Sequence, residues 1–110
     1  MTDVYVILVT APTDTEAATM ARTLVEERLV ACVNLLPALR SIYRWEGAVE
    51  EEGETLMILK SARERLGEVR DRVIELHPYD EPEFLALEVA EGSESYLNWV
   101  LAGTRRPERT

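Results

Sequence analysis

Along this chain of 110 residues, short blocks of consecutive apolar residues alternate with segments in which apolar residues recur every three or four positions. The first block, residues 4–9, reads VYVILV and is apolar at both odd and even positions. Because successive side chains of a strand point to opposite faces, this pattern predicts a central strand that is buried on both sides. Pro12 has no backbone N–H to donate and ends the block.

A helix is predicted to follow Pro12. Thr13 and Glu16 fit a Thr-x-x-Glu capping box, in which the threonine hydroxyl accepts a hydrogen bond from the Glu16 backbone N–H. The apolar residues of this helix lie on one stripe at helical spacing, formed by Ala17, Ala21, Leu24, Val25 and Leu29. The alanines of the stripe favour close packing on a sheet.

The next two blocks predict strands joined by a tight turn. The first strand covers residues 32–36 and is interrupted at Pro37, which favours an edge strand or a bulge. It resumes over residues 40–45 and ends at Glu46 and Gly47, a pair typical of turns. We therefore expect a hairpin at this position.

The strand after this turn is predicted to have two parts. Residues 50–54, EEEGE, are interpreted as a solvated bulge, with weak binding of cations as the alternative, and residues 55–60, TLMILK, as the buried part. Ser61 and Glu64 then fit a second capping box, which predicts that a helix starts directly after the strand.

Two helices and one strand complete the pattern. The second helix carries an apolar stripe at 3-4-3 spacing, formed by Leu66, Val69, Val73 and Leu76. A segment around His77 ends this helix, and residues 84–89 predict a fourth strand. Gly92 and Ser93 precede a last helix, which bears Tyr96, Leu97, Val100 and Leu101.

The order βαββαβ with an added C-terminal helix predicts an α+β, ferredoxin-like fold. It forms a single domain over residues 1–103, followed by a polar tail over residues 104–110. Helical crossovers make the first and second strands parallel, so the hairpin places the third strand antiparallel between them. Two helices cover one face of this sheet, yet three strands are apolar on both faces. We therefore expect other subunits to cover the second face.

Composition narrows the class of protein. The net charge is −9, from 12 basic and 21 acidic residues, which argues against nucleic acid and anionic membranes as partners. Cys32 is the only cysteine, so the chain forms neither an internal disulfide nor a Cys-x-x-Cys site. No basic-then-apolar leader opens the chain and no apolar run is long enough to cross a bilayer, so we expect a cytoplasmic protein.

The only histidine, His77, lies in the segment LHPYDEP over residues 76–82. Its two prolines restrict the backbone around an imidazole, a phenol and two carboxylates. One interpretation is a metal or proton-transfer site, with His77 as the imidazole ligand and Asp80 and Glu81 as oxygen ligands. The other is a stiff loop in which His77 stabilises the end of the second helix.

Six short motifs occur in order along the chain. They are Thr10-Ala11-Pro12, Ala31-Cys32-Val33-Asn34, Tyr43-x-Trp45-x-Gly47, Ile58-Leu59-Lys60, His77-Pro78-Tyr79-x-x-Pro82-Glu83 and Tyr96-Leu97-x-Trp99. Together they closely resemble the CutA family of divalent-cation tolerance proteins, over about residues 4–100. The resemblance implies a cytoplasmic homotrimer with a ferredoxin-like core, similar in architecture to the PII signalling proteins. It also implies a link to tolerance of copper and other divalent cations.

The candidate site residues fall into two groups. The metal candidates are His77, Asp80, Glu81 and Cys32. The preferred interpretation of Cys32 is a small buried residue, and a soft thiolate ligand for copper is the alternative. The candidates for a ligand cleft or a subunit interface are Tyr43, Trp45, Lys60, Tyr79, Glu83 and Trp99. Some copper-associated relatives carry a cysteine in place of Val9 and a second histidine in place of Leu76. Of that cysteine and the two histidines, this chain keeps only His77.

We predict a non-catalytic homotrimer that acts in divalent-cation tolerance and binds metal with modest affinity. The expected metal is copper, with zinc as the second choice, and no organic cofactor is expected. An alternative is a PII-like sensor that binds a small metabolite or nucleotide in clefts between subunits. An enzyme that uses His77 as a base is disfavoured because the sequence shows no nucleophile or oxyanion device beside it.

Overall fold

The computed structural model describes residues 1–106 of the chain. Its elements are β1 (Val4–Ala11), α1 (Asp14–Glu26), β2 (Cys32–Trp45), β3 (Ala48–Ala62), a short 3-10 helix η1 (Arg63–Arg65), α2 (Leu66–Leu76), β4 (Leu85–Glu88) and α3 (Glu94–Gly103). Part of the predicted polar tail, residues 107–110, lies outside the described residues. Among residues 1–106, no helix has the length and apolar character needed to cross a membrane.

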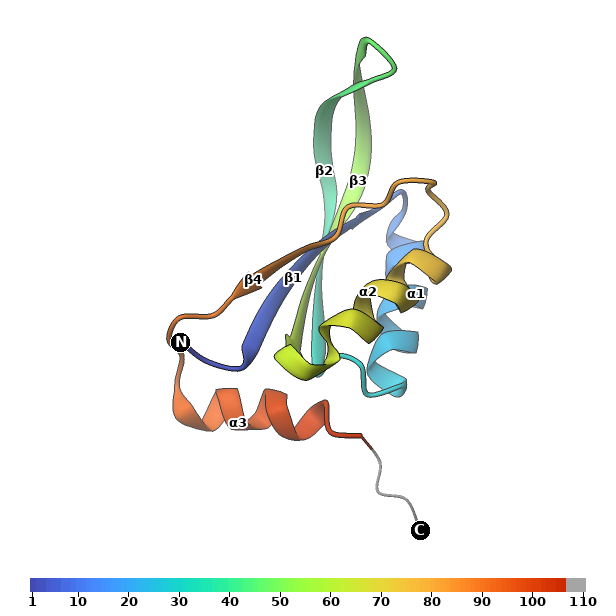
Figure 1. Ribbon diagram of the computed structural model, residues 1–110. Helices are drawn as coiled ribbons and strands as arrows, with labels where there is room; N and C mark the ends of the chain where they lie inside the picture. Colours follow the sequence, from blue (N-terminus) through green and yellow to red (C-terminus); the bar gives the residue numbers. More distant parts are fainter. Residues whose placement is uncertain (107–110) are drawn as a thin grey trace.

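The strands form one sheet in the order β2-β3-β1-β4, and every neighbouring pair is antiparallel. The predicted α+β, ferredoxin-like arrangement is therefore confirmed. Figure 1 shows α1 and α2 together on one side of the sheet, and α3 near the end opposite the β2–β3 turn. The hairpin of β2 and β3 extends well beyond the helices.

The hydrophobic core lies between the sheet and the two long helices. Its fully buried side chains include Ile7, Val9, Leu24, Met57, Leu59, Val69 and Val73. Leu66 and Leu76, the outer members of the predicted α2 stripe, are partly buried and pack against this cluster. Burial of these apolar groups is the main stabilising contribution to the fold.

Helix α1 begins as predicted, but its apolar stripe differs from the prediction, because the helix ends at Glu26 and the buried Leu29 lies beyond it. The Thr13 hydroxyl accepts a hydrogen bond from the Glu16 backbone N–H at 3.1 Å, which confirms the capping prediction. Val25 was predicted to face the sheet and is 41% exposed. It lies about 100° around the helix from Leu24, outside the arc of the buried side chains. Met20 is buried instead.

The second predicted capping box is wrong. Ser61 still belongs to β3, where its side chain is fully buried and its hydroxyl donates to the Leu29 carbonyl oxygen at 2.6 Å. Helix α2 begins only at Leu66, after η1, and the residue before it, Arg65, makes no side-chain capping bond. Strand pairing and a buried hydrogen bond outweigh the local capping pattern at this site.

The β2–β3 hairpin confirms the predicted turn and the edge strand or bulge predicted at Pro37, but not the bulge predicted at residues 50–54. Glu46 and Gly47 have φ values of 49° and 81°, as a tight hairpin turn requires. Residues 50–54 pair regularly with β2, so they form no bulge. The extra residue lies in β2 instead, between Leu36 and Leu39, next to Pro37. β2 is also an edge strand, which explains why this proline is tolerated.

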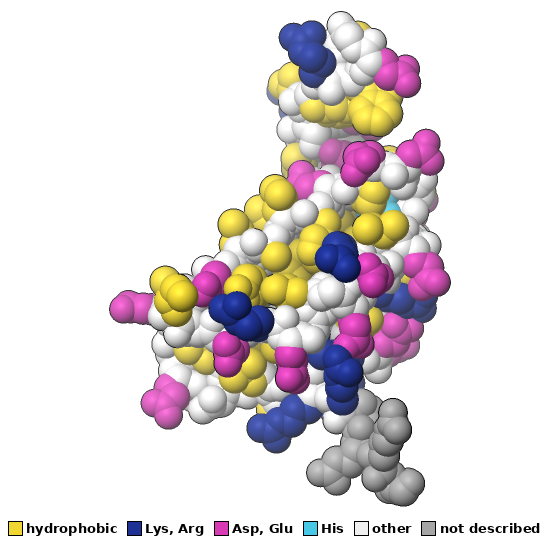
Figure 2. All heavy atoms as spheres, viewed as in Figure 1, with side chains coloured by type: hydrophobic (Ala, Val, Ile, Leu, Met, Phe, Trp, Pro, Cys, Tyr) yellow, Lys and Arg dark blue, Asp and Glu magenta, His cyan; other side chains and the backbone are white. Residues whose placement is uncertain are grey.

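The second face of the sheet is apolar and only partly covered. In β4, Leu85 and Leu87 are each more than half exposed, and Leu36 of β2 is nearly so. Helix α3 reaches the end of this face that contains Cys32, whose thiol lies beside the Tyr96 hydroxyl. Figure 2 shows hydrophobic side chains gathered in a band over the sheet region, with other atoms between them. Such a band is typical of a surface that another chain covers.

Candidate functional site

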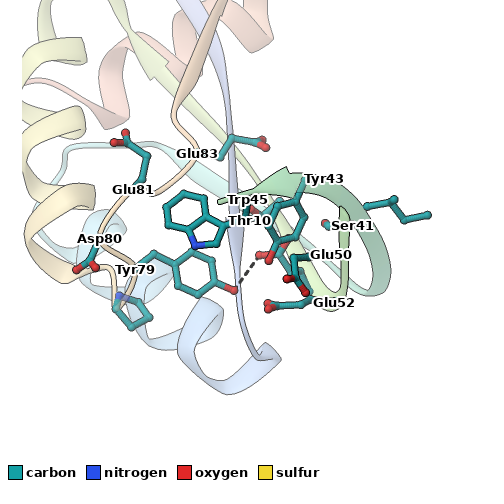
Figure 3. Close-up of a pocket in the computed structure, with 13 residues that line it drawn as sticks. Thr10, Ser41, Tyr43, Trp45, Glu50, Glu52, Tyr79, Asp80, Glu81 and Glu83 are labelled. Atoms are coloured by element: carbon teal, nitrogen blue, oxygen red, sulfur yellow. Dashed lines mark hydrogen bonds between the residues drawn. The ribbon is translucent and has the colours of Figure 1, made fainter. Parts of the chain in front are cut away.

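A groove of about 810 Å³ lies where the β2–β3 hairpin leaves the body of the protein. Side chains from β2, β3 and the loop between α2 and β4 line it, together with Thr10 of β1. Six of the lining side chains are carboxylates, namely Glu50, Glu52, Glu54, Asp80, Glu81 and Glu83. Tyr43, Trp45 and Tyr79 supply three aromatic rings (Figure 3). We call this feature the acidic groove.

The two-residue repeat of a strand explains why three glutamates meet in the acidic groove. Glu50, Glu52 and Glu54 occupy alternate positions of β3 and therefore point to the same side. Tyr43 of β2 pairs directly with Glu50, so its ring lies beside this row of carboxylates. The hairpin thus forms one wall of the groove.

His77 attaches the opposite wall to the sheet. It is 7% exposed, and its Nε2 lies 2.7 Å from the Thr10 carbonyl oxygen. Its Nδ1 accepts a hydrogen bond from the Tyr79 backbone N–H at 3.1 Å. Because a carbonyl oxygen can only accept, Nε2 carries the hydrogen and the ring is neutral with both nitrogens occupied. As a metal ligand, His77 would first have to break one of these bonds.

Tyr79 and Glu54 join the two walls of the groove. The Tyr79 hydroxyl donates to Glu54 Oε2 at 3.0 Å (dashed line in Figure 3), and Glu54 is 8% exposed. Desolvation raises the pKa of Tyr79, and the hydrogen bond to Glu54 and the negative charge of Glu54 raise it further. The phenol therefore stays protonated and keeps donating to Glu54 at neutral pH.

Negative charge in the acidic groove is not balanced by basic side chains. Among residues 1–106, no Lys or Arg lines the groove. Desolvation raises the pKa of the Glu83 carboxyl, and the charge of Glu54 adds to the effect. Desolvation likewise raises the pKa of Tyr43, followed by its hydrogen bond to Glu52. The negative charges of neighbouring glutamates add to both shifts, as expected where carboxylates accumulate.

The predicted metal ligands do not come together. Asp80 and Glu81 line the acidic groove, and His77 lies behind its wall with both nitrogens occupied. Cys32 pairs with Lys60 on the sheet, and the β1 partner of Lys60 is Val6, four residues from Thr10. That separation is about 13 Å along the strand, so Cys32 lies far from the groove. Among residues 1–106, no three Asp, Glu, His or Cys side chains are close enough to hold one metal ion.

The cleft candidates separate in the same way. Tyr43, Trp45, Tyr79 and Glu83 line the acidic groove. Lys60 instead contacts Cys32, with its Nζ 3.7 Å from the sulfur, and bonds the Asn34 side-chain oxygen. Trp99 lies on α3, where its ring stacks on Tyr96 at a centroid distance of 5.6 Å. Lys60 and Trp99 therefore belong to the second face of the sheet and to α3.

Sequence reasoning assigned Glu50, Glu52 and Glu54 to a solvated surface that could at most hold cations weakly, and it did not place them in a groove. These residues were interpreted as a solvated bulge because acidic runs are usually exposed. The useful signal was the alternation of glutamates on a strand, since it places their side chains on one face beside Tyr43. The burial of Glu54 had no signal in the local sequence, because its partner Tyr79 is 25 residues away.

Comparisons with known proteins agree with this fold. The family described as CutA1 divalent ion tolerance protein matches residues 5–102. A divalent-cation tolerance protein CutA of Thermus thermophilus is 48% identical over 90% of this chain and 96% of its own length. The solved structure of the protein of that name from the same species has a TM-score of 0.90 and 46% identity, and covers 93% of this chain and 99% of that one. CutA from Xylella fastidiosa gives a TM-score of 0.92 at 38% identity, covering 94% and 100%.

The family match spans almost the whole chain, and the relatives share both its length and its ferredoxin-like sheet. The resemblance carried by the six sequence motifs is thereby confirmed. The chain belongs to the CutA1 family of divalent ion tolerance proteins.

Proposed function

We propose that this protein acts in divalent-cation tolerance by binding the cation with modest affinity in the acidic groove. The observation that carries this proposal is the set of six carboxylates in one groove that no Lys or Arg of the described residues lines. An excess of fixed negative charge raises the local concentration of cations and favours their binding. Asp80 and Glu81, on the loop wall, remain the proposed first ligands.

The expected affinity is modest because the carboxylates do not converge. Within residues 1–106 the groove offers no cluster of three metal-ligating side chains, so a bound ion would keep several water ligands. Copper is the preferred ion in this proposal, since Cu²⁺ binds a given oxygen or nitrogen site more tightly than the other divalent ions of its row, zinc included. Tight copper binding would need the His77 imidazole, which is held by Thr10 and Tyr79.

We further propose that the protein is a homotrimer in the cytoplasm. The exposed apolar band of the second sheet face, with Leu36, Leu85 and Leu87, supports burial against other copies of the chain. The free thiol of Cys32 is compatible with a reducing compartment. A mass in solution three times that of the chain would support the trimer, and a monomer would contradict it.

We propose a binding role without catalysis. The only imidazole in the chain uses both nitrogens to hold the loop, and the only thiol lies at the other end of the sheet. The PII-like alternative would place a metabolite or nucleotide between subunits. A nucleotide in the acidic groove would bring phosphate charges close to six carboxylates, which favours the cation over the nucleotide there.

Calorimetric titration of Cu²⁺ into the metal-stripped protein at pH 7, with a weak competing chelator, tests this function. We expect saturable binding near micromolar affinity, with Zn²⁺ binding more weakly. The double variant Asp80→Asn/Glu81→Gln should weaken binding, while the exposed Glu26→Gln, outside the groove, should not. No heat beyond that of the chelator control would overturn the proposal.

A further inference from the structure

His77 forms two side-chain hydrogen bonds that respond differently to an added proton. Its Nε2 donates to the Thr10 carbonyl oxygen at 2.7 Å, and both the neutral and the charged ring can do this. Its Nδ1 accepts from the Tyr79 backbone N–H at 3.1 Å, and only the neutral ring can do this. Because an imidazolium carries a hydrogen on each nitrogen, protonation keeps the first bond and sets two N–H groups against each other at the second.

The packing around His77 directs this conflict into the loop that follows it. His77 is 7% exposed, and its ring lies against the Tyr79 ring at a centroid distance of 4.8 Å. Its backbone N–H donates to the Val73 carbonyl oxygen at 2.9 Å at the end of α2, and Pro78 restricts the backbone directly after it. The ring is therefore held by α2 and β1, so the loop from Tyr79 onward is the part that moves.

Tyr79 carries a movement of the loop into the acidic groove. Its backbone N–H is bonded to His77, and its hydroxyl donates to Glu54 Oε2 on β3 at 3.0 Å. Tyr79 also lines the groove together with Trp45 of the hairpin (Figure 3). Hydrogen bonds weaken steeply as their geometry departs from the ideal, so a shift of the Tyr79 backbone weakens or breaks the bond to Glu54. The loop wall then separates from the hairpin wall.

We propose that His77 is a pH-sensitive switch: a proton on Nδ1 releases the Tyr79 backbone N–H and opens the acidic groove between the loop and β3. Imidazole is the side-chain group that ordinarily changes charge between pH 5 and pH 8, and His77 carries the only one in the chain. The groove is thus closed at neutral pH and open in mild acid. This device goes beyond the binding of divalent cations and does not depend on it.

The charged groups on the elements around His77 favour the added proton. These elements contribute Tyr79, Asp80, Glu81 and Glu83 of the loop, Glu54 of β3, Glu75 in the last turn of α2 and Asp14 in the first turn of α1, while β1 carries no charged side chain. Carboxylates stabilise an imidazolium, and the C-terminal end of α2 acts in the same direction. Arg72, the basic residue of α2 nearest to His77 in sequence, is bonded to Glu27 and Glu75. Burial of the ring and the bond from Tyr79 oppose protonation, and the carboxylates and the helix end offset that opposition.

Three signals of the full chain, followed between pH 8 and pH 5, test the proposal. They are the nitrogen NMR spectrum of the single imidazole, the hydrogen exchange of the Tyr79 amide and the emission of Trp45. The Trp99→Phe background leaves Trp45 as the only tryptophan, and EDTA in the buffer excludes any effect of bound metal. At pH 8 we expect a hydrogen on Nε2 and none on Nδ1. As Nδ1 gains its proton, the Tyr79 amide should exchange at least about tenfold faster relative to an unstructured peptide at the same pH, and Trp45 emission should change with the same midpoint.

Two variants separate the switch from other titrating groups of the groove. Desolvation raises the pKa of Glu83, so this carboxyl also titrates closer to the range of the experiment. His77→Asn supplies a side-chain oxygen as acceptor for the Tyr79 N–H but takes up no proton there, and it leaves Glu83 in place. Its emission at pH 8 should match that of the parent, and the change toward pH 5 should disappear. Tyr79→Phe keeps the backbone N–H, so the imidazole should still titrate, but the emission of Trp45 should no longer follow it.

Three outcomes would overturn the proposal. The first is a His77 ring that stays neutral down to pH 5, and the second is protonation that changes neither the exchange of the Tyr79 amide nor the emission of Trp45. The third is an undiminished change of emission in His77→Asn, which would assign that change to Glu83. If this variant does not fold by circular dichroism, the first two outcomes, measured on the parent, still decide. Failure of the Cu²⁺ titration would leave the result unchanged, because this experiment contains no metal.

Discussion

The two halves of β3 belong to one continuous strand but have opposite surroundings. Residues 55–62 are buried or partly buried at every position, under the helices α1 and α2. Residues 48–53 are all exposed, because the hairpin has passed beyond both helices (Figure 1). The strand therefore changes from a core element to an exposed surface within one or two residues.

Glu54 and Thr55 mark the point where this change takes place. Both are buried, yet Thr55 pairs with Ala11 at the end of β1, and Glu54 lies against the loop through Tyr79. Apolar packing holds residues 55–62 of β3. Polar contacts between the hairpin and the loop hold the part of β3 that precedes them. The acidic groove forms at this junction because β1 ends there while β2 and β3 continue, and the carboxylates of β3 still lie on one face.

The largest expected effect comes from the buried half. Leu59→Ala removes a fully buried side chain from the core cluster and should lower the free energy of unfolding by about 3 kcal/mol. The measurement is urea denaturation at one fixed protein concentration, since any assembly makes the midpoint concentration-dependent. A loss below about 1 kcal/mol would contradict the view that helix packing holds this half of β3.

The fold was predictable where one local pattern decides the outcome. The strand blocks, the Thr13 cap and the Glu46–Gly47 turn each depend on residues that are close in sequence. Their order then implies the sheet topology, because the crossover and hairpin rules leave few alternatives. Ser61 shows the limit, since a correct local cap pattern lost to strand pairing and to a hydrogen bond with Leu29.

The candidate site was predictable only in part, because it depends on contacts between distant segments. The motif around Tyr79, Asp80 and Glu81 and the aromatic pair of β2 do meet in one groove. The role of His77 as a two-sided anchor depends on Thr10, which lies 67 residues earlier in the chain. Cys32 was a candidate metal ligand only because a thiolate binds copper. The register of the sheet places it at the end of the sheet far from the groove.

The second prediction tests the hydrogen bond from Tyr79 to Glu54, which joins the loop between α2 and β4 to β3. Tyr79→Phe removes the hydroxyl that donates to the buried Glu54 and should cost about 1.5 kcal/mol at pH 7. Because the pKa of Tyr79 is raised in the folded state, its contribution is complete below the ordinary phenol pKa of about 10. It is lost as the pH rises above that value toward the folded-state pKa.

Urea denaturation of both proteins between pH 7 and pH 11 measures this effect. The stability difference should stay constant up to about pH 9.5 and shrink above pH 10, since only the wild type loses the contribution of this phenol. A difference that grows with pH would have the opposite sign and would show that the phenol is not held by Glu54. The Tyr5→Phe variant is the control, since the half-buried Tyr5 ring lies under the Arg63 guanidinium and outside the groove.

The smallest expected effect concerns the face of the exposed part of β3 that points away from the groove. Glu51 lies between Glu50 and Glu52 in sequence, so its side chain points away from the groove, where it pairs with Arg40 at 2.8 Å. Both partners are well exposed, so Glu51→Ala should change the free energy of unfolding by only about 0.5 kcal/mol. Affinity for Cu²⁺ should also stay within about twofold, whereas Glu52→Gln, at a side chain that lines the groove, should weaken Cu²⁺ binding. Equal effects of the two substitutions would show that net charge, and not the face of the strand, governs this region.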